Sequence, residues 1–248
     1  MNARLAGVAA GCMAAAQLAP AVTAVGAVRR RLTPALAGVG DHSHIAITFD
    51  DGPDPRSTPQ FLAALRARDT RATFFLLGSA LAHTPALGRE LVASGHEVAV
   101  HGWDHRCLAA TSPQATLRSL TRARDVIADL TGQRPRWFRP AYGVLTTSAL
   151  WAAHNLELTP VLWTDWGRDW TRRATPSSVL DTLTRHLDGG ACVLMHDADS
   201  PTAAPGAWRS TLGALPGLIE HCQRRGIAVG PLADHRPKVD AAGGGVLG

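Results

Sequence analysis

The chain has 248 residues and a mass of 26.1 kDa, which is enough for one sizeable hydrophobic core and one domain of the (β/α) barrel class. Its formal net charge of +5 comes almost wholly from arginine, because Lys238 is the only lysine. No basic cluster is interleaved with stacking aromatic side chains. The composition therefore excludes nucleic-acid binding and indicates a general attraction to anionic envelope polymers.

The first 35 residues form an apolar segment of their own. No residue from 5 to 28 is charged, and the small residues around Ala24 and Ala27 suit a cleavage site. Such a segment is typical of a secretory signal or a weak membrane anchor, so we expect an extracytoplasmic protein, secreted or held at a membrane through residues 5–28. The three arginines at 29–31 argue against export by the positive-inside rule. A helix packed on the following domain, or lying at a membrane surface, is a further alternative.

Beyond this segment, strand-like and helix-like stretches alternate. Apolar runs predict strands at 45–49, 73–77, 97–100, 137–139, 158–164, 192–196 and 227–229. Helical periodicity and start and stop signals predict helices at 57–67, 85–93, 112–131, 146–154, 177–187 and 211–224. The longest of these helices begins at Ser112-Pro113 and is ended by Gly132.

This alternation predicts an α/β fold with a parallel sheet covered by helices. The candidate site residues follow predicted strands, and the carboxyl ends of strands in a barrel meet on one face. We therefore expect one domain at residues 36–238 with its site on that face. A flexible tail is predicted at 239–248, where three glycines stand in a row.

Residue types that bind metals follow two of these strands. Asp50 and Asp51 end an apolar run that is closed by Gly52-Pro53, and His101 and His105 follow a second such run. On a helical turn, residues four apart share a face, so the two imidazoles can point at one position. Two imidazoles and a carboxylate form the open ligand set of a catalytic zinc or related ion. The sequence thus predicts a hydrolytic metal site.

The cysteines add little to this site. None of the four shows C-x-x-C spacing, and Cys192 stands inside an apolar strand, so a disulfide framework is not expected. Cys107, two residues after His105, is either a further metal ligand or an ordinary free thiol.

Together, these motifs resemble those of the polysaccharide deacetylase family, the NodB-like group also called carbohydrate esterase family 4. Five stretches carry the resemblance, in the family's order and approximate spacing: 48–53, 101–105, 139–143, 169–170 and 194–197. The resemblance implies a distorted, incomplete (β/α) barrel. It also implies a metal-dependent hydrolase that removes N-acetyl groups from an N-acetylglucosamine-containing cell-wall glycan or chitin-like oligosaccharide.

The resemblance further implies roles for the matching residues near the metal. Asp51, His101 and His105 would bind one divalent ion, zinc in the first place, with cobalt, nickel or iron as alternatives. Asp50 would be the general base that takes a proton from water. Arg139 would hold and orient the Asp50 carboxylate through a charge-assisted contact.

The remaining roles concern the other side of the reacting amide. The backbone N–H of Tyr142 would help to stabilise the oxyanion, although a ring packed at the groove rim is an alternative role for this residue. His196 would be the general acid, with Asp169 behind it to raise its pKa. Trp170 and Leu194 would form the apolar pocket for the acetyl methyl group.

Three positions depart from the family's pattern. Gly102 replaces a usual Ser or Thr, Ala141 replaces a common proline, and Trp166 stands where many members carry another aspartate. These changes put the supporting hydrogen bonds and the sugar preference in doubt more than the type of reaction. Trp166 and its neighbour Trp163 suit a groove for sugar rings, although Trp163 is equally suited to core packing.

Other functions fit parts of the same pattern. Related barrels hydrolyse small non-sugar amides or imides, or O-acetyl esters. A non-catalytic glycan-binding relative would keep the fold, and two histidines with a carboxylate also hold iron in oxygenases. For the deacetylase itself we expect a monomer whose partner is an acetylated glycan substrate.

Overall fold

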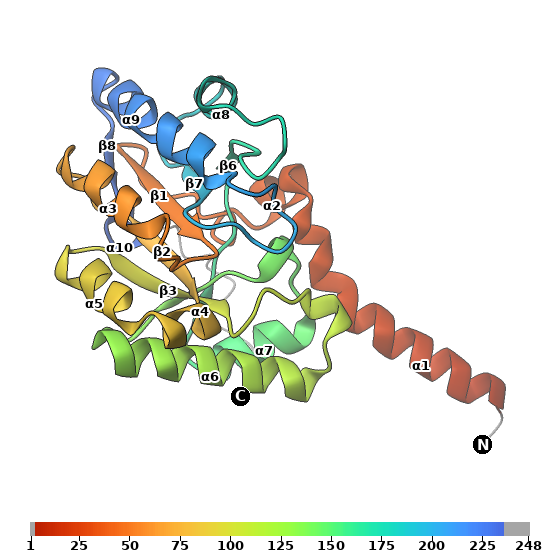
Figure 1. The fold of residues 1–248 in the computed structure, drawn as a ribbon. Coiled ribbons are helices and arrows are strands. Elements are labelled where there is room, and N and C mark those ends of the chain that lie inside the picture. Colours follow the sequence, from red (N-terminus) through yellow and green to blue (C-terminus); the bar gives the residue numbers. More distant parts are fainter. Residues whose placement is uncertain (1–2, 236–248) are drawn as a thin grey trace.

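A curled sheet of eight parallel strands lies at the centre of the structure, a computed structural model that describes residues 3–235 (Figure 1). The predicted flexible tail at 239–248 lies outside the described residues. The strands are β1 (His44–Asp50), β2 (Thr73–Leu77), β3 (Glu97–Gly102), β4 (Trp137–Phe138), β5 (Thr159–Pro160), β6 (Asp165–Trp166), β7 (Cys192–His196) and β8 (Ala228–Gly230).

The sheet is open, with the order β5-β4-β3-β2-β1-β7-β6, and β8 pairs with the start of β1. Within residues 3–235 no ladder joins β5 to β6, so the barrel does not close there. This architecture confirms the predicted α/β fold, a distorted and incomplete (β/α) barrel. Because all strands are parallel, their carboxyl ends lie at the same edge of the sheet.

Helices cover the outer face of the sheet (Figure 1). The α-helices are α1 (Ala3–Leu18), α2 (Gly26–Leu32), α3 (Thr58–Arg66), α4 (Gly78–His83), α5 (Pro85–Ala93), α6 (Pro113–Thr131), α7 (Thr147–Asn155), α8 (Pro176–Thr184), α9 (Trp208–Arg224) and α10 (Leu232–His235). Three short 3-10 helices are η1 (Ala19–Ala24), η2 (Leu108–Ala110) and η3 (Ala141–Gly143).

Strand β1 shows how the sequence places the site. All seven of its residues are buried, and side chains alternate between the two faces of a strand. Ile45, Ile47 and Phe49 belong to the large core beneath the helices, whereas Ala46 belongs to a second core inside the curled sheet. Asp50 is four residues after Ala46, so the two side chains lie on the same, inward-facing side of the sheet.

The helix ends follow the signals in the sequence. The Ser112 hydroxyl caps α6 by accepting a hydrogen bond from the backbone N–H of Ala115, and Gly132 ends the helix in the left-handed conformation at φ 72°. In α8, Thr175 and Ser178 form a reciprocal capping box. The long predicted helix at 112–131 is thereby confirmed to within one residue.

Several predicted bounds need correction. The strand predicted at 158–164 is reduced to the two residues of β5, and the two residues of β6 begin just after the predicted range, because the segment between β5 and β6 leaves the sheet where the barrel is open. The last long helix begins at Trp208, three residues before the predicted start. Helices α4 and α10 were not predicted, since each is too short to show a helical repeat.

The N-terminal segment bends at the junction of η1 and α2. No single helix among the described residues is long and apolar enough to cross a membrane, whereas the bent pair Gly11–Ala24 and Gly26–Leu32, at 93°, reaches that threshold by length and composition. The start of α1 extends away from the barrel, and the segment returns to it through η1 and α2 (Figure 1). Residues 16 and 17 already form hydrogen bonds to the start of α7.

Candidate active site

Asp51, His101 and His105 converge at the carboxyl edge of the sheet. The Nε2 atoms of both imidazoles lie 3.3 Å from Asp51 Oδ1, and one ligand atom from each residue lies within 4.8 Å of the others. Among residues 3–235, this is the group whose side chains are arranged to hold a metal ion. Cys107 is a free, half-buried thiol outside this group, so it is an ordinary cysteine here and not a further ligand.

The polar atoms of this group fit a divalent cation. Both carboxylate oxygens of Asp51 are buried and lack a hydrogen-bond donor among the described residues. His101 Nδ1 lies 2.9 Å from the carbonyl oxygen of Arg139, to which only a protonated Nδ1 can donate. The Nε2 lone pair of His101 is therefore directed toward Asp51, as in metal-binding histidines whose other nitrogen is held by a carbonyl.

Burial and charge act differently on the two imidazoles. Burial alone would lower the pKa of His101, but the Asp50 and Asp51 carboxylates outweigh it and raise that pKa above its usual value. Burial lowers the pKa of His105, which keeps its imidazole neutral near neutral pH. For Asp51, burial alone would raise the pKa, but the close contact with His101 and the neighbouring His196 and His105 imidazoles lower it below its usual value. Two neutral imidazoles and one carboxylate leave coordination positions open for water and substrate.

The two histidines meet for a reason other than the predicted one. His101 lies on β3, and His105 lies in the bend that follows it, so they do not share the face of a helical turn. Gly102 ends β3 just before this bend, and its φ of +117° is strained for any residue with a side chain. This explains a glycine at a position where the resembled family usually has Ser or Thr.

Asp50 is held by a fully buried arginine. Arg139 follows β4, is 0% exposed, and donates through Nη1 to Asp50 Oδ1 at 2.7 Å and to Thr48 Oγ1 at 2.8 Å. Its Nη2 donates to the carbonyl oxygen of Leu162 at 2.8 Å, and its guanidinium covers the Phe75 ring. Because these contacts fix the buried Arg139 guanidinium, the Asp50 carboxylate that it binds has a single orientation toward Asp51, His101 and His105.

His196 and Asp169 form the opposite side of the site. The His196 Nδ1 donates to Asp169 Oδ1 at 2.9 Å, and Asp169 Oδ2 accepts from the His196 backbone N–H and from Thr211 Oγ1. Burial lowers the pKa of His196, but the Asp169 carboxylate outweighs it and raises the pKa to about 10. His196 is therefore protonated near neutral pH, and its Nε2–H is free to donate a proton.

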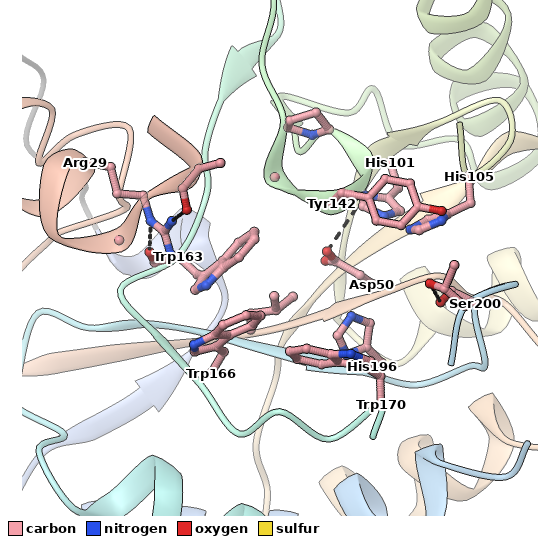
Figure 2. A pocket seen from close by; sticks show the side chains of 16 residues that line it. Arg29, Asp50, His101, His105, Tyr142, Trp163, Trp166, Trp170, His196 and Ser200 are labelled. Atoms are coloured by element: carbon pink, nitrogen blue, oxygen red, sulfur yellow. Dashed lines mark hydrogen bonds and ion pairs between the residues drawn. The ribbon is translucent and has the colours of Figure 1, made fainter. Parts of the chain in front are cut away.

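A cavity of about 280 Å³ joins these groups (Figure 2). Asp50 lies between the two metal-site histidines on one side and His196 on the other (Figure 2). Leu194 and Trp170 line the cavity beside His196, and the Trp170 ring meets the His196 ring at a centroid distance of 5.9 Å. These two residues provide its apolar floor.

Tyr142 lies at the rim of the cavity. It adopts the left-handed conformation at φ 61°, which is uncommon for a residue other than glycine and marks strained backbone at a functional position. Its ring is 45% exposed and contacts the His105 ring edge to face at 4.5 Å. Tyr142 therefore has both an unusual backbone conformation and a ring at the rim of the cavity.

Some cavity residues were not predicted. Ala24, Gly26 and Arg29 of the N-terminal segment line the cavity, as do Ser200 and Thr202 after β7. Arginines beside an apolar stretch were interpreted as a membrane signal, and nothing local in the sequence distinguishes Arg29 from its neighbours. The arginine's role depends on partners more than 130 positions away.

Asp197 was quoted only as part of a motif, but it is fully buried next to the metal ligands. Burial raises its pKa to about 7, and its carboxylate accepts a hydrogen bond from Thr58 Oγ1. A Cβ at Gly52 would lie 2.5 Å from Asp197 Oδ2. Only glycine therefore fits between Asp51 and this carboxylate.

Solved structures of other proteins have the same fold. A family 4 carbohydrate esterase from Streptomyces lividans in complex with acetate superposes with a TM-score of 0.70 at 29% identity, covering 80% of this chain and 98% of that one. A mutant of BA3943, a CE4 family pseudoenzyme with restored enzymatic activity, superposes with a TM-score of 0.71 at 27% identity over 78% and 67% of the two chains. Relatives with this fold thus include a pseudoenzyme.

Curated relatives agree with the fold. The chitooligosaccharide deacetylase of Bradyrhizobium sp. (strain ANU 289) is 36% identical over 198 residues, 76% of this chain and 88% of that protein. The peptidoglycan-N-acetylglucosamine deacetylase PgdA of Listeria monocytogenes is 35% identical over 163 residues, and the chain spans 34% of its length. The family model for polysaccharide deacetylase matches residues 37–161. With the open barrel and the Asp51, His101 and His105 group in place, the chain belongs to the polysaccharide deacetylase family.

Proposed function

We propose that the protein is a metal-dependent hydrolase that removes N-acetyl groups from an N-acetylglucosamine-containing glycan, leaving a free amine and acetate. The glycan would be a cell-wall polysaccharide or a chitin-like oligosaccharide. Two relatives, a chitooligosaccharide deacetylase and a peptidoglycan-N-acetylglucosamine deacetylase, support this substrate class. The observation that carries the proposal is the convergence of Asp51, His101 and His105, with Asp50 and His196 lining the same cavity as the two histidines.

Asp51, His101 and His105 would hold one divalent ion, zinc in the first place, and cobalt, nickel or iron suit the same donors. Such an ion, when bound, supplies Lewis-acid activation of water and of the amide carbonyl. The protein's own groups then position the reactants and move the protons. In this mechanism, no side chain of the protein has to act as the nucleophile.

Asp50 acts as the general base and takes the proton of the attacking water. Its second oxygen, Oδ2, lies 3.8 Å from His101 Nδ1, while Oδ1 is occupied by Arg139. Arg139 keeps the carboxylate oriented in a buried site. The backbone N–H of Tyr142 donates to the oxyanion as negative charge develops on the carbonyl oxygen.

His196 acts as the general acid. As the carbon–nitrogen bond breaks, its Nε2–H protonates the leaving nitrogen, and Asp169 stabilises the imidazolium before transfer. Trp170 and Leu194 hold the acetyl methyl in the apolar part of the cavity. The result is one carboxylate that accepts a proton and one imidazolium that donates one, a split of acid and base between two environments.

The test is acetate release from acetylated chito-oligosaccharides and peptidoglycan fragments by the parent protein and three variants. Asp50→Asn and His196→Ala should abolish turnover while the bound metal, measured by elemental analysis, stays close to that of the parent. Asp51→Asn should lose both metal and turnover. Substantial activity in Asp50→Asn or His196→Ala would reject the assigned roles.

The same assay separates the rival functions. Hydrolysis of small amides, imides or O-acetyl esters in preference to glycans would identify one of these compounds as the substrate instead of a glycan. Glycan binding without acetate release would identify a non-catalytic relative, a concern raised by the pseudoenzyme among similar structures. Dependence on oxygen would point to iron oxygenase chemistry. The retained Asp50, Arg139, Asp169 and His196 favour hydrolysis.

We further propose that the protein works as a monomer outside the cytoplasm, where such glycans occur, and does not bind nucleic acid. The apolar N-terminal segment is compatible with attachment to a membrane through residues 5–28. Size-exclusion chromatography with light scattering, together with fractionation of the expressing cell, tests both statements.

A further inference from the structure

The large apolar side chains that the described residues expose fall into two groups. Tyr142 and Trp166 line the catalytic cavity, which accounts for their exposure. The others lie on the N-terminal segment or on α7, and they are Val8, Met13, Leu18, Val22, Val25, Leu32, Leu150 and Trp151. Apolar surface gathered in this way on a folded protein marks a contact with a partner or a membrane.

Helix α1 has no polar face to turn toward water. From residue 5 to residue 18 it carries no charged side chain, and residues 11–16 are all exposed. A helix that is apolar on every side is normally buried in a protein core or in lipid. At about 1.5 Å per residue its 16 residues extend about 24 Å, which is less than the hydrocarbon core of a bilayer. The helix therefore suits entry into a bilayer from one side without crossing it.

Helix α7 carries a second apolar face on the barrel itself. The side of α7 that packs on the core is made of small residues, Ser148, Ala149, Ala152 and Ala153. Leu150 and Trp151 lie on the opposite, outward side, where their exposed fractions are 37% and 58%. None of the nine residues of α7 is acidic. This outward face combines two large apolar side chains with no charge that an anionic surface would repel.

Hydrogen bonds join this face of α7 to the end of α1. Thr147 Oγ1 donates to the carbonyl oxygen of Ala16 at 2.7 Å, and the side chains of Gln17 and Ser148 are bonded to each other. Trp151 follows Thr147 by four residues and therefore shares its side of the helix. From this junction the start of α1 extends away from the barrel (Figure 1). The exposed indole thus lies about one helical turn from the point where α1 leaves the domain.

The bend after α1 adds basic side chains to the same surface. Gly11–Ala24 and Gly26–Leu32 meet at 93°, so α2 runs parallel to a bilayer that α1 enters along its normal. Arg30 and Arg31 are exposed on α2. A basic residue near an anionic leaflet strengthens binding about fivefold. Lipid also covers α1 on every side, whereas a second protein chain would cover one side only.

We propose that α1, α2 and the outward face of α7 form one membrane-contact surface, which docks on a bilayer that contains anionic phospholipid. Helix α1 enters the acyl layer, and Leu150 and Trp151 lie at the boundary between headgroups and acyl chains, where tryptophan is favoured. Arg30 and Arg31 face the phosphates. The contact through α7 goes beyond attachment by residues 5–28, because it fixes how the barrel is turned toward the membrane. It does not depend on deacetylase activity.

The first test measures binding of the full-length protein to vesicles of phosphatidylglycerol and phosphatidylcholine by flotation. Leu150→Ser combined with Trp151→Ser should lower the partition coefficient at least about tenfold, because apolar area no longer leaves water on docking. Leu150→Met combined with Trp151→Phe keeps that area and is the matched control, expected within about threefold of the parent. Parental binding by the serine variant would overturn the α7 contact. Thermal unfolding identifies a loss due to misfolding.

The second test locates Trp151 even where α1 alone holds every variant on the vesicle. Phospholipids brominated on their acyl chains quench tryptophans that reach the headgroup boundary. They should quench part of the emission of the parent, and Trp151→Phe should lose that quenched part, because the remaining tryptophans lie on other elements. The same quenched fraction in the parent and in Trp151→Phe would contradict the proposed orientation.

The third test addresses the charge. Arg31→Gln should weaken binding to vesicles with phosphatidylglycerol about fivefold and leave binding to pure phosphatidylcholine unchanged. Equal effects on both vesicles would reject a contact between α2 and anionic headgroups. A parent that binds no vesicle but forms a dimer, which the serine variant dissociates, would assign the face to a second copy of the chain and overturn the inference.

Vesicle binding separates this inference from the proposed function. Asp50→Asn, which lacks the proposed general base, should bind vesicles like the parent. Docking by a protein that releases no acetate would support the surface and reject the deacetylase. An active deacetylase that binds no vesicle would reject the surface and leave the proposed function in place.

Discussion

Replacing Asp169 with asparagine should move the alkaline limit of activity to lower pH. The Asp169 carboxylate is buried and accepts hydrogen bonds from the His196 ring, from the His196 backbone and from Thr211. Asparagine keeps nearly the same shape but removes the negative charge that stabilises the imidazolium. Burial, which lowers the pKa of His196, would then be opposed only by the smaller effects of the Asp51 and Asp50 carboxylates.

The size of the effect follows from the pKa of His196. With the pKa raised to about 10, the imidazole keeps its proton through neutral pH and loses it only as the pH rises through that value. If the pKa returns to its ordinary value of about 6.5, only about 3% of the protein carries the proton at pH 8. The general acid would be scarce, and kcat/KM at pH 8 should fall at least about thirtyfold.

The assay is a pH–rate profile of acetate release between pH 5 and about 10. Asp169→Asn should show its alkaline decline near or below pH 6.5, and the control Asp188→Asn, an exposed carboxylate, should keep the profile of the parent. The same alkaline limit in Asp169→Asn and in the parent would refute the assignment of Asp169 and His196 as an acid pair.

Three other perturbations have defined outcomes. Arg139→Met should destabilise the fold by about 3–5 kcal/mol in urea unfolding, because Asp50 becomes an unpaired buried charge, and a loss below about 1 kcal/mol would contradict this. Gly52→Ala should lower metal affinity about 10- to 100-fold in competition with a chelator, because the new Cβ displaces Asp51 or Asp197, and parental affinity would count against it. The active protein should retain residues 19–24 by intact mass, because η1 supplies two acceptors of Arg29, whereas full activity of a chain that begins at Val25 would contradict this.

The sequence predicted the parts of the site that depend on local order. Asp50 and His196 each stand at the end of an apolar run, and parallel strands bring such ends to one edge of the sheet. The alternation of strands and helices was sufficient to predict a parallel α/β sheet, and the family resemblance implied that its barrel is incomplete. The family motifs then suggested which of the eleven histidines to consider.

The parts that were missed depend on distant partners. Arg29 looks like its two neighbours in the sequence, and only the carbonyl oxygen of Trp163 in the folded chain distinguishes it. The convergence of His101 and His105 was expected from a helical turn, but it comes from the bend that follows Gly102 at the end of β3. Strands β5 and β6 are short because the barrel stays open, which is a property of the whole sheet.

The most direct test of the account is the location of the metal. Crystals of the protein grown with zinc, and measured on both sides of the zinc absorption edge, should show an anomalous peak about 2 Å from Asp51, His101 Nε2 and His105 Nε2. Asp50 and His196 should then face that peak from opposite sides. A peak bound by other residues, or a Zn²⁺-saturated crystal without a peak between these three side chains, would contradict the central claim.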